Sequence, residues 1–173
     1  IQNNRTTQRY GVGSTQSFGI NIYNTSKQTM DNFIFRNMTF KKVYALSYVN
    51  PVNQNAFNKF EVTAIRFSSD WNKANINNVL VENCFFTDLQ RLGVHIKHAK
   101  GNNGQDNRQT NFIFRNNEFY KIGGTCILPS RTRNCLIEYN IFNQPGAKTN
   151  AKMIGRGSAV WNWHSVNTMV QYN

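Results

Sequence analysis

One nine-residue pattern recurs along this chain and constrains its fold more than any other feature. Residues 111–119 read NFIFRNNEF, and residues 32–40 read NFIFRNMTF. Residues 78–86 (NVLVENCFF) and 134–142 (NCLIEYNIF) follow the same plan, and residues 167–173 (NTMVQYN) begin a fifth copy. Each copy is a short apolar strand that begins at Asn, and such a repeat predicts a solenoid whose coils stack strand upon strand.

The spacing of the copies indicates a parallel β-helix. The first Asn recurs at positions 32, 78, 111, 134 and 167, so the spacings are 46, 33, 23 and 33 residues. The shortest spacing matches one bare coil, and the longer ones match that coil with inserted loops, which leave a stack without disturbing its register. We therefore expect about five coils, a segment of a longer solenoid, with these residues in one column: Ile34, Leu80, Ile113, Leu136 and Met169.

A second strand precedes the Asn strand in each coil and is mostly entered through a small residue such as Gly19, Ala64 or Gly93. Side chains alternate between the two faces of a strand. The set expected to point inward is Ile20, Ile22, Ile65, Phe67, Val94, Ile96 and Val160. The set expected to point outward is Asn21, Tyr23, Arg66, His95, Lys97, Trp161 and Trp163. For the Asn strands, three adjacent apolar positions leave the inward face unassigned.

The composition agrees with a β-solenoid of one domain. Residues 1–17 are polar and rich in Gly, Ser and Thr, which predicts an approach loop, and residues 18–173 are expected to form the β-helix. The chain has 28 Asn, and Asn disfavours helices but can form hydrogen-bonded ladders between stacked strands. In the fifth repeat position Arg36, Glu82, Arg115 and Glu138 alternate in sign, which indicates an ion-pair ladder between coils.

The charge points to an acidic partner. The net charge is +12, which suits an anionic polymer, although charge for solubility explains it equally well. There is no basic run, zinc spacing or helix-turn-helix pattern, so no nucleic acid is expected, and no apolar run long enough for membrane insertion. An anionic polysaccharide is therefore the expected partner. Both ends look cut, so the remaining rungs of the same solenoid are a further expected partner.

The cysteines carry no metal signature. Cys84, Cys126 and Cys135 are odd in number and lack metal-ligand spacing, so neither a metal site nor a cofactor is expected. Cys84 and Cys135 lie inside repeat strands and are expected to be buried. A bridge between Cys126 and Cys135 stays open as an alternative.

Over residues 18–173 the repeat resembles the secreted right-handed parallel β-helix proteins, a superfamily with pectate lyases, polygalacturonases, alginate and chondroitin lyases and glycoside hydrolases. The resemblance implies a right-handed parallel β-helix and a secreted, periplasmic or cell-surface location. Residues 153–173, MIGRGSAVWNWHSVNTMVQYN, resemble a rung of large β-helix glycoside hydrolases with the pattern W-x-W followed by Q-Y-N. In those proteins the next rung carries aspartates, so the resemblance implies catalytic carboxylates beyond residue 173.

Two reactions on polysaccharides are considered. The first expectation is a glycoside hydrolase, which needs two carboxylates. Asp70, in the loop after Phe67, is the most site-like acid in this chain. The alternative is a lyase on a uronic-acid polymer, which needs a base and a cation to neutralise the carboxylate. His95 and Lys97 alternate outward on one strand, and Arg131 follows the equivalent strand one coil later.

That arrangement is similar to alginate-type lyases of the same fold, which would add a calcium ion as cofactor. Their calcium-binding glutamates have no counterpart here, because residues 93–100 contain no acid. A third alternative is a non-catalytic glycan-binding or adhesion solenoid, such as a tailspike shaft.

The substrate groove is predicted from the outward set. Trp161 and Trp163 are two residues apart and face the same way in a strand, which suits the apolar face of a sugar, although covering a core edge would explain them almost as well. Together with Arg66, His95 and Lys97 they form the predicted substrate-binding surface.

Overall fold

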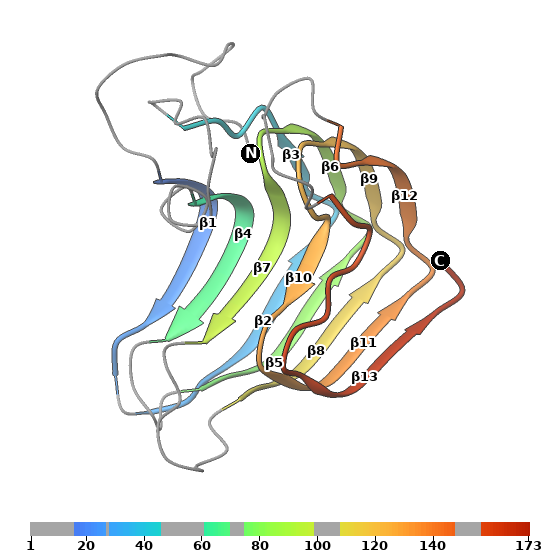
Figure 1. The fold of residues 1–173 in the computed structure, drawn as a ribbon. Helices are drawn as coiled ribbons and strands as arrows, with labels where there is room; N and C mark the ends of the chain where they lie inside the picture. The colour runs from blue at the N-terminus through green and yellow to red at the C-terminus, as the bar shows by residue number, and fades with distance from the viewer. Residues whose placement is uncertain (1–15, 27, 46–60, 70–74, 99–107, 148–156) are drawn as a thin grey trace.

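The chain folds as an all-β solenoid with parallel strands in the computed structural model, which describes residues 16–26, 28–45, 61–69, 75–98, 108–147 and 157–173. Three parallel sheets form the sides of the coil, as Figure 1 shows. Each of the first four turns contributes one strand to each sheet in order, and the fifth contributes β13 to sheet B, so that the coils stack along one axis.

Sheet A and sheet C form two of these sides. Sheet A has the order β1-β4-β7-β10, with β1 (Gln16–Asn24), β4 (Glu61–Ser69), β7 (Leu92–His98) and β10 (Ile127–Pro129). Sheet C has the order β12-β9-β6-β3, with β3 (Thr39–Lys41), β6 (Phe85–Leu89), β9 (Glu118–Ile122) and β12 (Ile141–Pro145).

Sheet B contains the repeated Asn strands. Its order is β13-β11-β8-β5-β2, with β2 (Met30–Arg36), β5 (Ile76–Glu82), β8 (Gln109–Arg115), β11 (Thr132–Glu138) and β13 (Val166–Gln171). The predicted register is confirmed, because Ile34 pairs with Leu80, Leu80 with Ile113, Ile113 with Leu136, and Leu136 with Met169.

The first Asn of each repeat is a corner of the coil. Asn32, Asn78, Asn111, Asn134 and Asn167 all have a positive φ, between 52° and 64°. Among residues other than glycine, Asn is the type that most readily adopts this left-handed conformation. The side chains of these corners also join the coils, since Asn134 Nδ2 donates to Asn111 Oδ1 (3.0 Å) and Asn167 Nδ2 donates to Asn134 Oδ1 (3.2 Å).

The corner settles which face of sheet B is internal. The residues one and three positions after the corner are buried in the three middle strands, as Phe112 and Phe114 illustrate at 0% exposure. The residue between them therefore points outward, and Ile34 is 63% exposed. The column expected from the sequence thus lies on the outside of the solenoid.

The interior is held by stacked rings and a buried asparagine ladder. Phe40, Phe86, Phe119 and Phe142 stack ring on ring, with centroids 4.9, 4.5 and 5.3 Å apart in that order. At the next corner, Asn117 Nδ2 donates to Asn140 Oδ1 (2.9 Å) and also to the carbonyl of Val81 (2.9 Å). Each buried amide is therefore satisfied by the neighbouring coils.

The inward assignment for sheet A is confirmed. Ile65, Phe67, Val94 and Ile96 are fully buried, and the remaining three residues of the set pack against the core: Ile20, Ile22 and Val160. Residues 1–15 of the predicted approach loop lie outside the described residues, and β1 begins at Gln16. The described residues form no helix that could cross a lipid bilayer.

Candidate functional site

The outer face of sheet A brings the predicted binding residues into two columns. Arg66 pairs with His95, and His95 pairs with Leu128 on the next coil. On the following coil, Ile127 forms a bridge with Val160. The next residues of the two segments, Leu128 and Trp161, are therefore neighbours, and Trp161 continues the column.

The second column lies two residues further along each strand. Ser68 pairs with Lys97, and Ser130 bridges Trp163. Because the pairing of Pro129 with Ile96 places Ser130 next to Lys97, the column runs from Ser68 through Lys97 and Ser130 to Trp163. The register therefore places the five residues predicted for the groove in two neighbouring columns of sheet A.

A buried carboxylate organises the cationic part of this face. Glu61 Oε1 lies 3.2 Å from Arg66 Nε and 3.5 Å from His95 Nδ1, and Glu61 Oε2 lies 3.2 Å from Lys97 Nζ. The Glu61 side chain is only 6% exposed, whereas Lys97 is 44% exposed. These four residues are called the Glu61 cluster below, and solvent reaches it from the Lys97 side.

A bend in β4 places Glu61 among side chains that simple alternation would put on the other face. Ala64 and Ile65 are consecutive and both fully buried, so the alternation changes phase between them. Glu61 precedes the bend and Arg66 follows it, and their side chains meet on the outer face.

The backbone of β7, the strand next to β4, is also closely packed beside Gly93. A Cβ at Gly93 would lie 2.4 Å from the carbonyl oxygen of Cys126 and 2.8 Å from the ring of Phe119. The glycines within β1 and β7, Gly19 and Gly93, therefore permit close contact with the phenylalanine stack.

The cluster fixes the charge of its members. Burial alone would raise the pKa of Glu61, but His95, Lys97 and Arg66 outweigh burial and lower it to about 2. Burial lowers the pKa of His95 below 6.5, and the neighbouring Glu61 only partly opposes this. At neutral pH the cluster therefore contains an ionised Glu61 beside a neutral imidazole.

The position of Glu61 also favours one tautomer of His95. Glu61 Oε1 lies 3.5 Å from Nδ1 without forming a hydrogen bond to it, so the negative charge of the carboxylate favours the proton on Nδ1 through electrostatics alone, with Nε2 as the basic nitrogen. A carboxylate that orients an imidazole in this way is a frequent arrangement for a general base.

Buried hydroxyl groups lie beside the cluster. Within the described part of the chain, Thr63 Oγ1 and Ser68 Oγ are buried and have no hydrogen-bond partner, and the same is true of Glu61 Oε1, Arg66 Nε and His95 Nδ1 inside the cluster, where Lys97 Nζ alone donates to Glu61 (3.2 Å). Such groups are rare in folded proteins and are satisfied when a ligand supplies the missing partner. Ser68 stands next to Lys97 in the sheet, so its buried hydroxyl lies beside the exposed end of the cluster.

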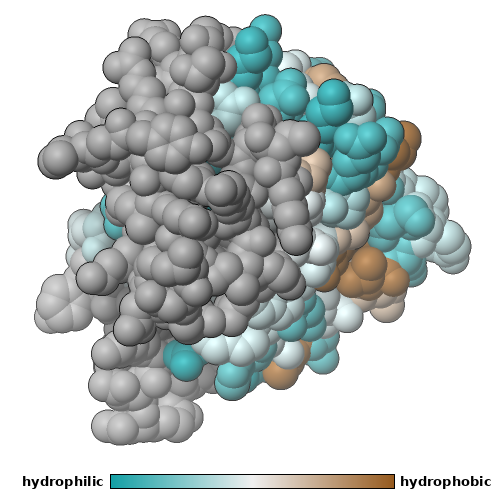
Figure 2. Space-filling view, turned by 45° about the horizontal axis from the view of Figure 1, so that its top comes forward, coloured by the Kyte–Doolittle hydropathy of each residue, from teal (hydrophilic) through white to brown (hydrophobic). Residues whose placement is uncertain are grey.

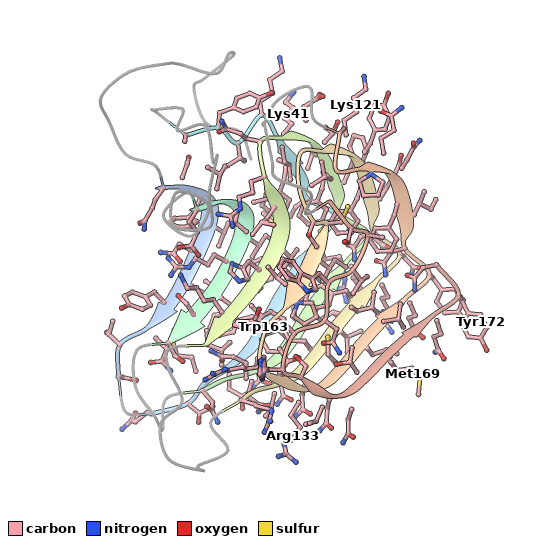
Figure 3. The ribbon with its side chains drawn as sticks, in the orientation of Figure 1. Lys41, Lys121, Arg133, Trp163, Met169 and Tyr172 are labelled. Carbon is pink, nitrogen blue, oxygen red and sulfur yellow. The ribbon has the colours of Figure 1, made fainter. Side chains whose placement is uncertain are left out.

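The remaining predicted residues are less closely connected to the cluster. Arg131 lies at a corner after β10, with φ 56°, and its backbone N–H donates to the carbonyl of Trp163 (2.8 Å). Asp70 lies outside the described residues. Trp163 is 50% exposed and meets His164 edge-on at 4.7 Å, and Figure 3 labels it on the segment that precedes β13.

The cysteines are free. Cys84, Cys126 and Cys135 are buried thiols, so no bridge joins Cys126 to Cys135. Burial raises the pKa of each thiol, which keeps it protonated at neutral pH. Among the described residues no group of three His, Cys, Asp or Glu side chains could hold a metal ion.

The sequence patterns missed the role of Glu61. Its position follows a long insertion, and the bend at Ala64 hides its relation to Arg66. The available signal was composition, because Glu61 is the only acidic residue in the described strands of sheet A.

A second surface lies on the outside of sheet B. A groove of about 610 Å³ runs across its five strands, between the corner asparagines and the apolar side chains that follow them. The predicted ion-pair ladder lies beside it, since Glu82 pairs with Arg36 through Oε1 and with Arg115 through Oε2 (2.8 Å). Glu138 Oε2 accepts a hydrogen bond from Gln171 (2.8 Å).

Comparisons of the chain with protein-family models, with curated proteins and with solved structures find no match.

Proposed function

We propose that this protein binds an acidic polysaccharide along the outer face of sheet A and cleaves it by β-elimination. The observation that carries this proposal is the Glu61 cluster, in which one buried carboxylate holds His95, Arg66 and Lys97 together on the face that also presents Trp161 and Trp163. Elimination requires a base and a positive charge beside the substrate carboxylate, and aromatic rings add a stacking surface for the sugar.

The charges of the cluster fit a uronic-acid unit. Arg66 and Lys97 contribute two positive charges and Glu61 one negative charge, so one positive charge remains for a substrate carboxylate. A cation near that carboxylate makes the neighbouring carbon–hydrogen bond more acidic, because it stabilises the negative charge that develops when the proton leaves.

The neutral His95 supplies the base. Its Nε2 accepts the proton from the carbon next to the carboxylate, and the electron pair forms a double bond as the glycosidic carbon–oxygen bond on the next carbon breaks. The leaving oxygen takes a proton from Lys97 or from water. Glu61 positions the imidazole through Nδ1 and stabilises the charge that His95 gains.

Hydrolysis, the reaction expected first from the sequence, requires a second carboxylate. The described strands of sheet A contain only Glu61, whose pKa of about 2 makes it a poor proton donor. A hydrolytic pair would therefore need a carboxylate from outside the described strands of sheet A, and the side chains of these strands support elimination better.

We also infer that the solenoid is a right-handed parallel β-helix of the pectate-lyase-like kind, acting on glycans outside the cell. Successive parallel strands, a buried asparagine ladder and stacked phenylalanine rings support this, and connections between parallel strands are almost always right-handed. An experimental structure with left-handed coils would contradict it.

The activity is tested with polygalacturonate, alginate and hyaluronan as substrates. Elimination creates an unsaturated product that absorbs ultraviolet light, whereas hydrolysis creates reducing ends without that absorbance. We expect H95Q to lose about 100-fold or more of the elimination rate. K97Q is expected to weaken substrate binding, and K121Q, which changes a lysine of sheet C, is the matched control and should behave as wild type.

Four outcomes test the proposal and its alternatives. Full activity in H95Q would overturn His95 as the base. Reducing ends without unsaturated product would favour hydrolysis, and binding without cleavage would favour an adhesion solenoid. Failure to bind any acidic polysaccharide would contradict the whole proposal.

A further inference from the structure

The outer face of sheet B presents apolar side chains in register on five strands. We call this set the apolar column: Ile34, Leu80, Ile113, Leu136 and Met169. Ile34 and Met169 at its ends are 63% and 56% exposed, and Figure 3 shows Met169 pointing away from β13. Aligned exposed side chains of this kind mark an interaction surface more often than scattered ones do.

The neighbourhood of this column differs from the rest of the surface. On the face shown in Figure 2, the described surface is mostly hydrophilic with a few separate apolar patches. On sheet B, by contrast, the groove runs beside the apolar column over the full width of the sheet. Nothing in the Glu61 cluster uses this side of the coil, because that cluster lies on sheet A.

Two residues further along each strand lies the charged column: Arg36, Glu82, Arg115, Glu138 and Gln171. Over the first four strands its signs run plus, minus, plus, minus. Read in the opposite direction the order is minus, plus, minus, plus. If a second copy of this column lies opposite the first and runs in the reverse direction, each charge therefore faces a charge of the opposite sign.

We propose that the outer face of sheet B is a docking surface for a second copy of this chain. The two copies pack face to face about a twofold axis parallel to the strands, between β5 and β8. This operation keeps each column opposite itself and reverses the order of the coils.

Every pairing across this axis is favourable. In the apolar column Ile34 meets Leu136, and Leu80 meets Ile113. In the charged column Arg36 meets Glu138 of the second copy, and Glu82 meets its Arg115. Glu82 already pairs with Arg115 within one copy, with side chains that are 8% and 42% exposed, so the exposed Arg115 of each copy reaches towards Glu82 of the other and the centre becomes a ring of four alternating charges.

The corner asparagines match in the same way. Asn32 faces Asn134, and Asn78 faces Asn111. A primary amide carries both donors and an acceptor, so two facing columns of amides satisfy each other.

The size of the face predicts a weak dimer. Four overlapping strands of seven residues give a projected face of about 19 by 23 Å, which is about 900 Å² over both copies. Protruding side chains bury somewhat more accessible surface than this. The interface is therefore at the lower end for specific complexes, and we expect a concentration-dependent equilibrium between monomer and dimer.

The first test replaces apolar side chains on two different sheets of the whole chain. I34E and I113E place a charge in the apolar column and should lower the dimer fraction in sedimentation equilibrium by about tenfold or more. I141E is the matched control, because Ile141 is 61% exposed but belongs to sheet C, and it should dimerise as wild type. Dimers that persist in I34E and I113E, or that are lost equally in I141E, would overturn the proposal.

The second test inverts the charged column. The variant R36E/E82R/R115E/E138R keeps the alternation within one copy and is again complementary to its own reverse. We expect this variant to dimerise with itself but not with wild type, because like charges then face each other across the axis. Free mixing of the two chains, measured by energy transfer between labelled copies, would overturn the twofold arrangement.

Polysaccharide binding at the same face is the competing occupant. One outcome would exclude a second copy as the occupant: the wild type and I34E are both monomeric, and I34E has lost the glycan binding that the wild type shows. The elimination assay with H95Q is independent of this result, since the two sites lie on different sheets.

Discussion

Each coil of the solenoid turns at residues whose backbone lies in the left-handed region. Asn32, Asn78, Asn111, Asn134 and Asn167 supply one such corner, and their amides also link the coils. Asn is therefore repeated for two reasons, since Gly would permit the turn but could not form the ladder. The abundance of Asn could be interpreted from sequence because both reasons are local.

The pH dependence of stability is expected to follow His95. Its pKa in the folded protein lies below 6.5, so the unfolded chain takes up the proton first as the pH falls. The stability contributed by the neutral imidazole is therefore present above pH 6.5 and is lost below it. We expect the Tm to fall between pH 7 and 5, and the fall to be smaller in H95Q.

Glu61 acts in the same direction at lower pH. Its pKa is lowered from 4.5 to about 2, so the stability that it contributes is lost as the pH falls from about 4.5 towards 2.

A Tm that falls equally between pH 7 and 5 in wild type and H95Q would contradict the assignment of this pH dependence to His95.

The location of Glu61 shows what residue patterns could not provide. Alternation correctly places Arg66, His95 and Lys97 on one face because each lies within a regular strand. Glu61 joins them only through the bend at Ala64 and Ile65, and a bend of this kind has no period in the sequence. Long-range packing against the neighbouring coils determines it.

At the level of strands, the repeated pattern was sufficient to predict the pairing. The register of sheet B follows from aligning the first Asn of each copy, because a shift by one residue would move every side chain to the other face. The inward face could not be predicted, since residues such as Phe112, Ile113 and Phe114 are all apolar. The corner at Asn111 decides it by directing Phe112 and Phe114 inward.

The phenylalanine stack of sheet C is expected to contribute strongly to stability. Phe86 is fully buried between Phe40 and Phe119, with ring centroids 4.9 and 4.5 Å away. F86A removes both contacts and leaves a cavity, so we expect a loss of about 3–5 kcal/mol in the free energy of unfolding. Urea denaturation measures it.

The matched control is F142A at the other end of the stack. Phe142 is half-buried and has one stacked neighbour, Phe119, at 5.3 Å. We expect F142A to cost about 1–2 kcal/mol, because less apolar surface becomes exposed. Equal losses in the two variants would show that the stack does not act through burial between neighbouring rings.

At the scale of the whole molecule, the three sheets give the solenoid three different sides. Sheet A carries the Glu61 cluster, sheet B carries the apolar and charged columns, and sheet C carries the phenylalanine stack on its inner face. Pairing two copies through sheet B does not involve the outer face of sheet A in either copy. Binding of a polysaccharide and formation of a dimer are therefore compatible.

The length of the proposed binding face predicts that the cations and the indoles contribute separately to the affinity for the polysaccharide. Arg66 and Trp161 lie in one column three coils apart, which is about 14 Å and long enough for two or three sugar units. Cations at one end and indoles at the other should act independently because they contact different units of the chain.

Variants measured at two salt concentrations separate these contributions. W161A/W163A should weaken binding of polygalacturonate by about tenfold at both low and high salt, because stacking on a sugar is not screened. K97Q should weaken binding at low salt, and its effect should shrink towards none in about 1 M NaCl, where the screening length is about 3 Å. Isothermal titration calorimetry measures both variants against wild type. Unchanged binding in W161A/W163A would exclude the indoles from the substrate surface. If the effect of K97Q on binding persists at high salt, Lys97 acts by holding Glu61 in place and not by attracting the acidic polysaccharide.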